Sequence, residues 1–386
     1  MQFAFTEEQE LIRDTARRFC DQHGSPERVR MAVESSHGYD QATWRAIGEE
    51  MGWCGIALPE GVGGSGLGAV ELAILCEQMG RMLLPSPFFA TACLAAPAIA
   101  LAGSPAQQQA LLPDIAAGRT RATLALSNSQ GDPGLAGIGA RLARVTGALR
   151  LTGEAGFVIH ADAANLLVVA VRAEGSLGSD GVSLLVVAPD QKGVTIEPLV
   201  MMDRTRPMSR VHFDSVEVPR EAVLGEVESA GPALAKALSR AQAALAAEQL
   251  GGAEAALEIT TEYAKARMQF DRPIGSFQAV KHRLADMMVM TEAARSAAYY
   301  AACAVDELPA ELDEAAAIAG SWCSDTYTNC AGNMIQLHGG VGFTWDHVAH
   351  LYFKRARASA MLLGSPAWLR EQIAQRLSLG PAQAAT

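Results

Sequence analysis

Aromatic residues are scarce in this chain. Phe, Trp and Tyr together make up 6% of its 386 residues, whereas hydrophobic residues as a whole make up 49% and alanine is abundant. Small aliphatic side chains favour closely packed helices over an aromatic-rich β-sandwich. Because the length exceeds that of one ordinary hydrophobic core, we expect two or three packed units.

Basic tracts are also missing. The chain has 31 Lys and Arg against 42 Asp and Glu, which gives a formal net charge of −11, and no long run of basic residues occurs. A nucleic acid is therefore not an expected partner, because nucleic-acid surfaces require clustered positive charge. An anionic ligand would need a local basic pocket.

Two further absences concern the compartment. The seven cysteines include no CxxC pair, so they predict reduced, mostly buried thiols, and no metal site is predicted. No charged-then-apolar signal opens the chain and no run of about 18 apolar residues occurs, so we expect no membrane insertion and a cytoplasmic location. The alanine-rich residues 91–102 are too short to cross a bilayer and predict a buried helix.

Local signals divide the chain into three segments. Thr6 and Gln9 have the spacing of a capping box, and helical patterns continue from there to about residue 118. From about Arg121, β-branched residues alternate between Gly, Asp and Pro breaks, with a hairpin turn predicted at residues 146–148. Long alanine-rich helices return from Gly231. We predict an N-terminal α-helical domain (1–118), a middle β domain (119–226) and a C-terminal helical bundle (227–386).

A glycine-rich stretch, LPEGVGGSGLG at residues 58–68, invites comparison with phosphate-binding loops. It matches neither GxGxxG nor GxxxxGK, and no strand clearly precedes it. The stretch therefore predicts a connection between helices.

The most informative stretch is YAKARMQFDRPIGSFQAVKHRLADM at residues 263–287. Pro273 and Gly275 separate two helical patterns, which leaves a short basic loop that contains Arg267, Gln269 and Phe270. A fork-shaped cation, an amide and an aromatic ring suit the pyrophosphate and adenine of a dinucleotide. A solvated helix-turn-helix corner has the same pattern and stays open as the alternative.

A second stretch, QLHGGVGF at residues 336–343, adds paired glycines that let backbone approach a ligand closely. Together the two stretches resemble the acyl-CoA dehydrogenase family. The resemblance runs without a gap from about Arg240 to Ser365 and is weaker but continuous over the rest of the chain.

The resemblance implies an α+β fold with an N-terminal helical domain, a middle β-barrel-like domain and a C-terminal four-helix bundle. It implies FAD bound between the subunits of a dimer, usually within a dimer of dimers, and dehydrogenation of an acyl-CoA to a trans-2-enoyl-CoA. The electron acceptor would be an electron-transfer flavoprotein or a similar protein. The implied cofactor contacts are Arg267, Gln269, Phe270, Gln278, Gln336, Gly339 and Gly340 from the bundle, Leu126, Ser127, Phe157 and Ile159 from the β domain, and Ser365.

The catalytic base is the largest departure from the family pattern. The reaction needs a carboxylate near the α carbon of the thioester. By motif position, one usual glutamate site falls on Leu363 and the other on Ala241. An arginine that often follows the second site is Gln242 here. Glu248 and Asp346 are weak substitutes.

Three explanations are open, and they belong to different classes. The chain is one subunit of a heteromeric acyl-CoA dehydrogenase whose partner supplies the base, as in the catabolism of steroid side chains or other bulky acyl groups. Alternatively, another carboxylate serves a homo-oligomer. In the third explanation the flavin performs monooxygenase chemistry on the same fold, and a non-catalytic subunit that binds acyl-CoA and FAD is a further reading. His347 and His350 in GFTWDHVAHLYFKRA are predicted to be interface or core residues rather than metal ligands.

Overall fold

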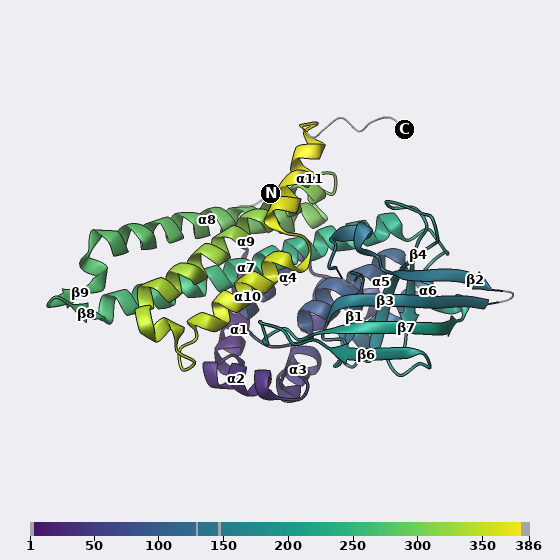
Figure 1. Ribbon diagram of the computed structural model, residues 1–386, viewed down its shortest axis with the longest axis horizontal. Coiled ribbons are helices and arrows are strands. Elements are labelled where there is room, and N and C mark those ends of the chain that lie inside the picture. The colour runs from purple at the N-terminus through teal and green to yellow at the C-terminus, as the bar shows by residue number, and fades with distance from the viewer. Residues whose placement is uncertain (1–3, 129, 146–147, 380–386) are drawn as a thin grey trace. The chain divides into compact units, whose positions relative to one another are not determined.

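A computed structural model describes residues 4–128, 130–145 and 148–379 (Figure 1). The described chain forms two compact units, and each draws on separate stretches of the sequence. Unit 1 combines the described parts of Met1–Arg30, Ala69–Leu84 and Gln242–Thr386, and unit 2 combines those of Met31–Gly68 and Pro85–Ala241. Part of the N-terminal helical region therefore belongs with the C-terminal helices, and the rest belongs with the sheet.

Helices come first along the chain. Thr6 accepts a hydrogen bond from the Gln9 backbone, and the Gln9 side chain accepts one from the Thr6 backbone, so the capping box is confirmed. Residues 58–68 form a connection between helices, as predicted. The elements are α1 (Glu7–His23), α2 (Pro26–Glu34), α3 (Gln41–Arg45), η1 (Ala46–Glu50), η2 (Trp53–Gly55), η3 (Glu60–Val62), α4 (Ala69–Arg81), η4 (Phe89–Ala95), α5 (Ala96–Ala102) and α6 (Pro105–Ala116).

A seven-stranded mixed sheet follows in unit 2. Its strands are β1 (Ala122–Ala125), β2 (Ala140–Val145), β3 (Ala148–Ile159), β4 (Leu166–Arg172), β5 (Val182–Val187), β6 (Val194–Pro198) and β7 (Met208–Val218). The order is β1-β4-β2-β3-β7-β6, and β5 also pairs with β4. Almost all of β4 is buried, as expected for a strand covered on both faces. β2 and β3 pair as the predicted hairpin, whose turn residues Thr146 and Gly147 lie outside the described residues.

The apolar pattern of β7 changes phase halfway along the strand. Val211 and Phe213 are buried, and so are Val216 and Val218, although a strict period of two would place the second pair on the opposite face. One extra residue enters β7 between Phe213 and Val216, where Ser215 has a φ of +53°. This β-bulge returns the apolar side chains to the core face.

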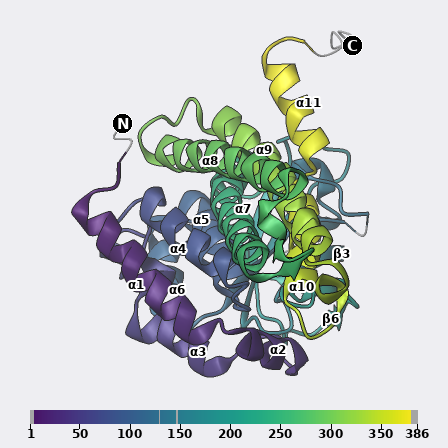
Figure 2. The same ribbon diagram turned by 90° about the vertical axis from the view of Figure 1, so that its left-hand side faces the viewer.

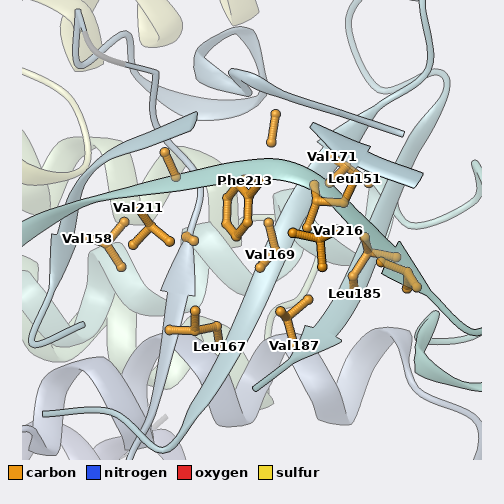
Figure 3. Packing of buried hydrophobic residues seen from close by; sticks show 14 of the residues in the cluster. Leu151, Val158, Leu167, Val169, Val171, Leu185, Val187, Val211, Phe213 and Val216 are labelled. Carbon is orange, nitrogen blue, oxygen red and sulfur yellow. The ribbon is translucent and has the colours of Figure 1, made fainter. Parts of the chain in front are cut away.

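The core of the sheet is aliphatic, as the scarcity of aromatic residues predicts. Figure 3 shows side chains from four strands pointing into one cluster, in which Phe213 is the single labelled aromatic residue. The labelled members are Leu151 and Val158 of β3, Leu167, Val169 and Val171 of β4, Leu185 and Val187 of β5, and Val211, Phe213 and Val216 of β7.

The C-terminal part is helical apart from one small hairpin. Its elements are α7 (Gly231–Ala266), β8 (Met268–Gln269), β9 (Arg272–Pro273), η7 (Ile274–Ser276), α8 (Gln278–Asp306), α9 (Leu312–His338), η8 (Gly339–Phe343), α10 (Ala349–Leu362) and α11 (Pro366–Arg376). Figures 1 and 2 both show α8 and α9 lying side by side. The succession of helices, sheet and helices is confirmed. No helix among the described residues is both long enough and apolar enough to cross a membrane.

α4 crosses α7 with almost no space between the two backbones. A Cβ added to Gly251 of α7 would lie 1.9 Å from the Glu77 carbonyl oxygen, and one added to Gly80 of α4 would lie 2.0 Å from the Glu248 carbonyl oxygen. Glycine is therefore required at both points, because no side chain fits there. This crossing joins α4 to the C-terminal helices within unit 1.

Candidate functional site

The predicted basic loop after α7 is a tight β-hairpin. Met268 pairs with Pro273 and Gln269 with Arg272, so Phe270 and Asp271 form a two-residue turn. Both turn residues have positive φ, +53° and +61°, which is the backbone of a type I′ turn. The segment is thus more regular than a loop, because the turn closes a ladder between β8 and β9.

The hairpin packs against the ring of Phe277. The Arg272 guanidinium carbon lies 4.0 Å from the ring centroid of Phe277, and the ring of Phe270 meets Phe277 edge-on at 6.1 Å. Phe270 is nevertheless 85% exposed, and Arg267 and Gln269 are exposed too. The hairpin therefore presents a cation, an amide and an aromatic ring on its outer surface.

The glycine turn at the end of α9 is open on its outer side. α9 ends at His338, and Gly339 follows with a φ of +61°. A Cβ added to Gly339 or Gly340 would meet no atom within 4 Å. Gln336 is exposed on the last turn of the helix. The backbone of this turn is therefore free for close approach by a ligand.

Tyr263 ties the hairpin to the glycine turn within unit 1. Its ring stacks on the ring of His338 with centroids 4.2 Å apart, and its hydroxyl donates to the His338 carbonyl at 3.5 Å. The Arg267 N–H donates to the Tyr263 carbonyl at 2.8 Å. The structure thus brings the two predicted stretches together. The stack itself was missed, because nothing in the local sequence marks Tyr263 and His338 as neighbours.

In unit 2, the predicted strand-end residues lie beside a second β-bulge. Phe157 is the extra residue of β3 opposite β7 and has a φ of +54°. Such strained backbone in a non-glycine residue is concentrated at functional sites. The neighbouring Gly156 N–H donates to the Ser127 carbonyl at 2.6 Å. Phe157 is 40% exposed, whereas Leu126 and Ile159 are buried, so those two could offer a ligand only backbone groups. The Ile159 carbonyl already accepts from the Thr123 hydroxyl.

The two usual base positions differ in accessibility. Ala241 is fully buried within α7. Leu363 is half-buried, lies at the C-terminal cap of α10 and precedes Gly364, which has a φ of +121°. The next residue, Ser365, uses its side chain to accept from the Trp368 N–H at 3.2 Å and so caps α11. Neither an alanine nor a leucine can take a proton.

The two weak substitutes have different surroundings. The Glu248 carboxylate is buried and lies 3.9 Å from the buried Arg355 guanidinium, so it is one half of an interior ion pair. Asp346 is exposed, and its backbone carbonyl accepts a hydrogen bond from Arg30. Gln242 packs its amide against Gly320 of α9, where a Cβ would lie 2.2 Å from the amide nitrogen, and it is therefore a core residue of unit 1.

The comparisons with known proteins agree across almost the whole chain. Residues 6–119 match the family model described as the acyl-CoA dehydrogenase N-terminal domain, and residues 232–378 match that of the C-terminal domain. Acyl-CoA dehydrogenase IpdE2 of Mycobacterium tuberculosis is 34% identical over 360 residues, which cover 93% of this chain and 94% of that protein. The chain belongs to the acyl-CoA dehydrogenase family.

Solved structures confirm the fold. A chain of the ChsE4-ChsE5 complex from Mycobacterium tuberculosis superposes with a TM-score of 0.89 at 28% identity and covers 99% of this chain and 100% of that chain. A variant described as the Tcur3481-Tcur3483 steroid ACAD superposes with a TM-score of 0.86 at 32% identity and covers 96% and 98%.

As a member of the acyl-CoA dehydrogenases, this chain is an FAD-dependent oxidoreductase that acts on acyl-CoA. FAD supplies the two-electron acceptor for oxidation of a carbon–carbon bond. The described residues fit this cofactor, because an exposed cation and amide stand beside a turn with space at both glycines. A diphosphate with an adenine is the ligand that such a set of donors suits.

A cavity of about 520 Å³ in unit 1 contains none of the predicted site residues. It is lined by arginines and glutamates of α1, α4, α7 and α8. Among the lining residues, the buried Glu77 accepts a hydrogen bond from the Tyr299 hydroxyl at 2.6 Å, and a nitrogen of the Arg295 guanidinium lies 3.9 Å from its carboxylate. Burial and the neighbouring Glu254 raise the pKa of Glu77 to about 7. An uncharged Glu77 is therefore present in the folded chain at mildly acidic pH.

Glu77→Gln is expected to change how stability depends on pH. Between pH 4.5 and 7 the folded chain holds a proton on Glu77 that the unfolded chain has released, so the free energy of unfolding falls as pH rises through this window. The free energy of unfolding of the variant lacks this decline. The difference in unfolding free energy between the variant and the parent should therefore shift by about 3 kcal/mol in favour of the variant between pH 4.5 and pH 8. Urea unfolding at several pH values measures the difference. Glu262→Gln, at an exposed glutamate of the same cavity, is the control. If the free energy of unfolding depends on pH equally in Glu77→Gln and in the parent, the raised pKa of Glu77 is contradicted.

Proposed function

We propose that this acyl-CoA dehydrogenase is one subunit of a heteromeric enzyme and that the partner subunit supplies the catalytic base for a bulky acyl-CoA. The observation that carries the proposal is the occupation of both usual base positions by side chains without a proton acceptor, Leu363 and Ala241. Loss of the α proton of a thioester needs a positioned base, whose contribution is about 10²–10⁴-fold in rate. A chain that lacks a catalytic base would recover this rate contribution in a complex with a partner subunit that carries a base.

Two comparisons support a pairing of unlike chains. The similar structure of the ChsE4-ChsE5 complex is named for two different chains, and so is the Tcur3481-Tcur3483 steroid acyl-CoA dehydrogenase. The second name also supports a bulky, steroid-derived acyl group as the substrate class. A dimer of dimers, with an electron-transfer flavoprotein or a similar acceptor, completes the proposal.

The cofactor contacts that we propose fall into two groups. Unit 1 provides side chains and an open turn for the diphosphate and adenosine of FAD, and unit 2 provides a strand end and a bulge for the ring of another FAD. The first group is Arg267, Gln269, Phe270, Gln278, Gln336, Gly339 and Gly340, and the second is Leu126, Ser127, Phe157 and Ile159. Ser365 of unit 1 is a further proposed contact with the cofactor. The division into domains 1–118, 119–226 and 227–386 is kept as part of this proposal.

Co-expression with a glutamate-bearing relative tests the heteromer. We expect the chain alone to hold little flavin and to show no bleaching by acyl-CoA without oxygen, and the complex to gain both flavin and activity. The control is a partner whose base glutamate is changed to glutamine, which should assemble and hold flavin but not react. Full dehydrogenase activity of this chain on its own would refute the proposal.

Arg267→Ala is expected to weaken FAD binding by about 10- to 100-fold, because a charge-assisted hydrogen bond to phosphate contributes about 1.5–3 kcal/mol. The dissociation constant can be measured from the quenching of flavin fluorescence in the assembled enzyme. Arg18→Ala, at an exposed arginine of α1, makes the same change of charge away from the site and should have no effect. If Arg267→Ala and the parent bind FAD with equal affinity, the hairpin is not part of the FAD site.

A further inference from the structure

Three histidines gather where the glycine turn leads into α10. His338 ends α9, His347 lies two residues before α10, and His350 lies in the first turn of α10. The rings of His338 and His347 have centroids 4.4 Å apart, and Tyr263 of α7 stacks on His338 at 4.2 Å. Nowhere in the described ranges do three His, Cys, Asp or Glu side chains stand close enough to hold one metal ion. The rings instead form a chain of contacts in which Tyr263 stacks on His338 and the His347 ring meets His338 at an interplanar angle of 45°.

Hydrogen bonds define the protonation of the His338 and His347 imidazoles. The Nδ1 of His338 lies 2.7 Å from the Met334 carbonyl and must carry a proton to donate to it, while its Nε2 is buried without a hydrogen-bond partner. The Nδ1 of His347 accepts from the Ala349 N–H at 3.1 Å and therefore carries no proton. Because a doubly protonated imidazole cannot accept a hydrogen bond, His347 must be neutral in this arrangement.

The surroundings of His347 oppose a second proton. Burial comes first, followed by His338, His350 and Arg30 of α2, and together they lower the pKa of His347 below its usual 6.5. Its acceptor role also places it at the N-terminal end of α10, where the helix dipole disfavours a cation. Lys354 of α10 lies over the Trp345 ring on the same loop. Tyr263 contacts His338 rather than His347, and Asp346 is exposed.

We propose that His347 is an acid-sensitive cap that positions the cofactor-binding turn. While it is neutral, it holds the first turn of α10 through the Ala349 N–H. Through its contact with His338 and the stack on Tyr263, it also keeps Gly339 and Gly340 in register with the Arg267 hairpin. When it takes up a proton, the cap is lost and the turn loosens. This inference rests on the proposed contacts of both segments with FAD.

The direction of the pH effect follows from the same arrangement. In a loosened segment His347 takes up a proton with its usual pKa of 6.5, whereas in the ordered segment its pKa is lower. Acid therefore favours the loosened state. FAD affinity should be constant between pH 7 and 8. It should then fall by about tenfold by pH 5.5, which is the scale on which loss of a helix cap acts.

Two substitutions of His347 distinguish loss of the hydrogen bond to the Ala349 N–H from loss of the titrating group. Asparagine accepts a hydrogen bond from the backbone two residues on and does not titrate, so His347→Asn should keep the pH 7.5 affinity and lose the decline in acid. His347→Ala should bind FAD about tenfold more weakly at every pH. His212→Asn removes a titratable imidazole from β7, where it pairs with Glu154 and Glu197, and should leave the parent profile unchanged.

The measurements are the FAD dissociation constant of the assembled enzyme from pH 5.5 to 8 and, in the chain without flavin, hydrogen exchange of the amides of residues 339–349. After correction for the intrinsic pH dependence of amide exchange, the protection factors of these amides should fall in acid in the parent and not in His347→Asn. An unchanged acid decline of FAD affinity in His347→Asn, or unchanged protection factors in the parent, overturns the inference. If exchange behaves as expected while Arg267→Ala binds FAD normally, the cap stands and the proposed cofactor site fails instead.

Discussion

Leu363→Glu is expected to raise the rate at which an acyl-CoA bleaches the flavin of this chain by about 10²–10⁴-fold. The position is half-buried at the end of α10, so a carboxylate can be accommodated there without being fully desolvated. The C-terminal end of a helix disfavours negative charge, and this favours proton uptake by the new group. Anaerobic stopped-flow mixing at saturating FAD measures the effect.

Leu363→Gln is the matched control. Glutamine has the same shape as glutamate but lacks a carboxylate to take the proton, so this variant should leave the rate of flavin bleaching unchanged. Ala241→Glu is a harsher test of the other base position. Ala241 is fully buried, so an ionised carboxylate there lowers stability before it can act. If Leu363→Glu and Leu363→Gln react equally slowly while both hold flavin, the α carbon does not approach position 363 and the assigned position is wrong.

Gly251→Ala is expected to lower the free energy of unfolding by about 3 kcal/mol, at the upper end of the range for overpacking. The new methyl group would stand 1.9 Å from a backbone oxygen of α4, and backbone cannot move aside as a flexible side chain can. The two helices must separate, which also disturbs the buried carboxyl and tyrosine pair at Glu77. The midpoint of thermal unfolding should fall by about 5 °C.

Gly332→Ala is the control for this effect, since Gly332 lies within α9 and a Cβ there meets no atom within 4 Å. Alanine is better than glycine in a helix by about 1 kcal/mol, so this variant should be more stable than the parent. The same substitution thus has opposite signs at two helical glycines. A gain of stability of similar size in both variants would show that helix propensity, rather than the close crossing, governs the result.

Features that depend on neighbouring residues were predicted well. The capping box at Thr6, the presence of strands in the β domain and the apolar helical stretch at residues 91–102 all arise from signals a few residues apart. The two stretches around Arg267 and Gly339 were assigned by resemblance to one site, and the described structure brings them together through Tyr263. The shape of the hairpin was not foreseen, because a Phe-Asp turn with two positive φ values is rare without glycine.

By itself, the sequence determined the order of helices and strands, the family and the absence of a proton acceptor at the usual base positions, since each depends on which residues follow one another. Only the tertiary structure decided that Glu248 is held by Arg355, that Gln242 packs inside a helical unit and that the ring of His347 accepts from the Ala349 N–H beside His338. It also decided that α4 packs with C-terminal helices far along the chain, through Gly80 and Gly251. Such contacts join residues that are distant in sequence, and local periodicity carries no information about which distant backbone will lie across a given helix face.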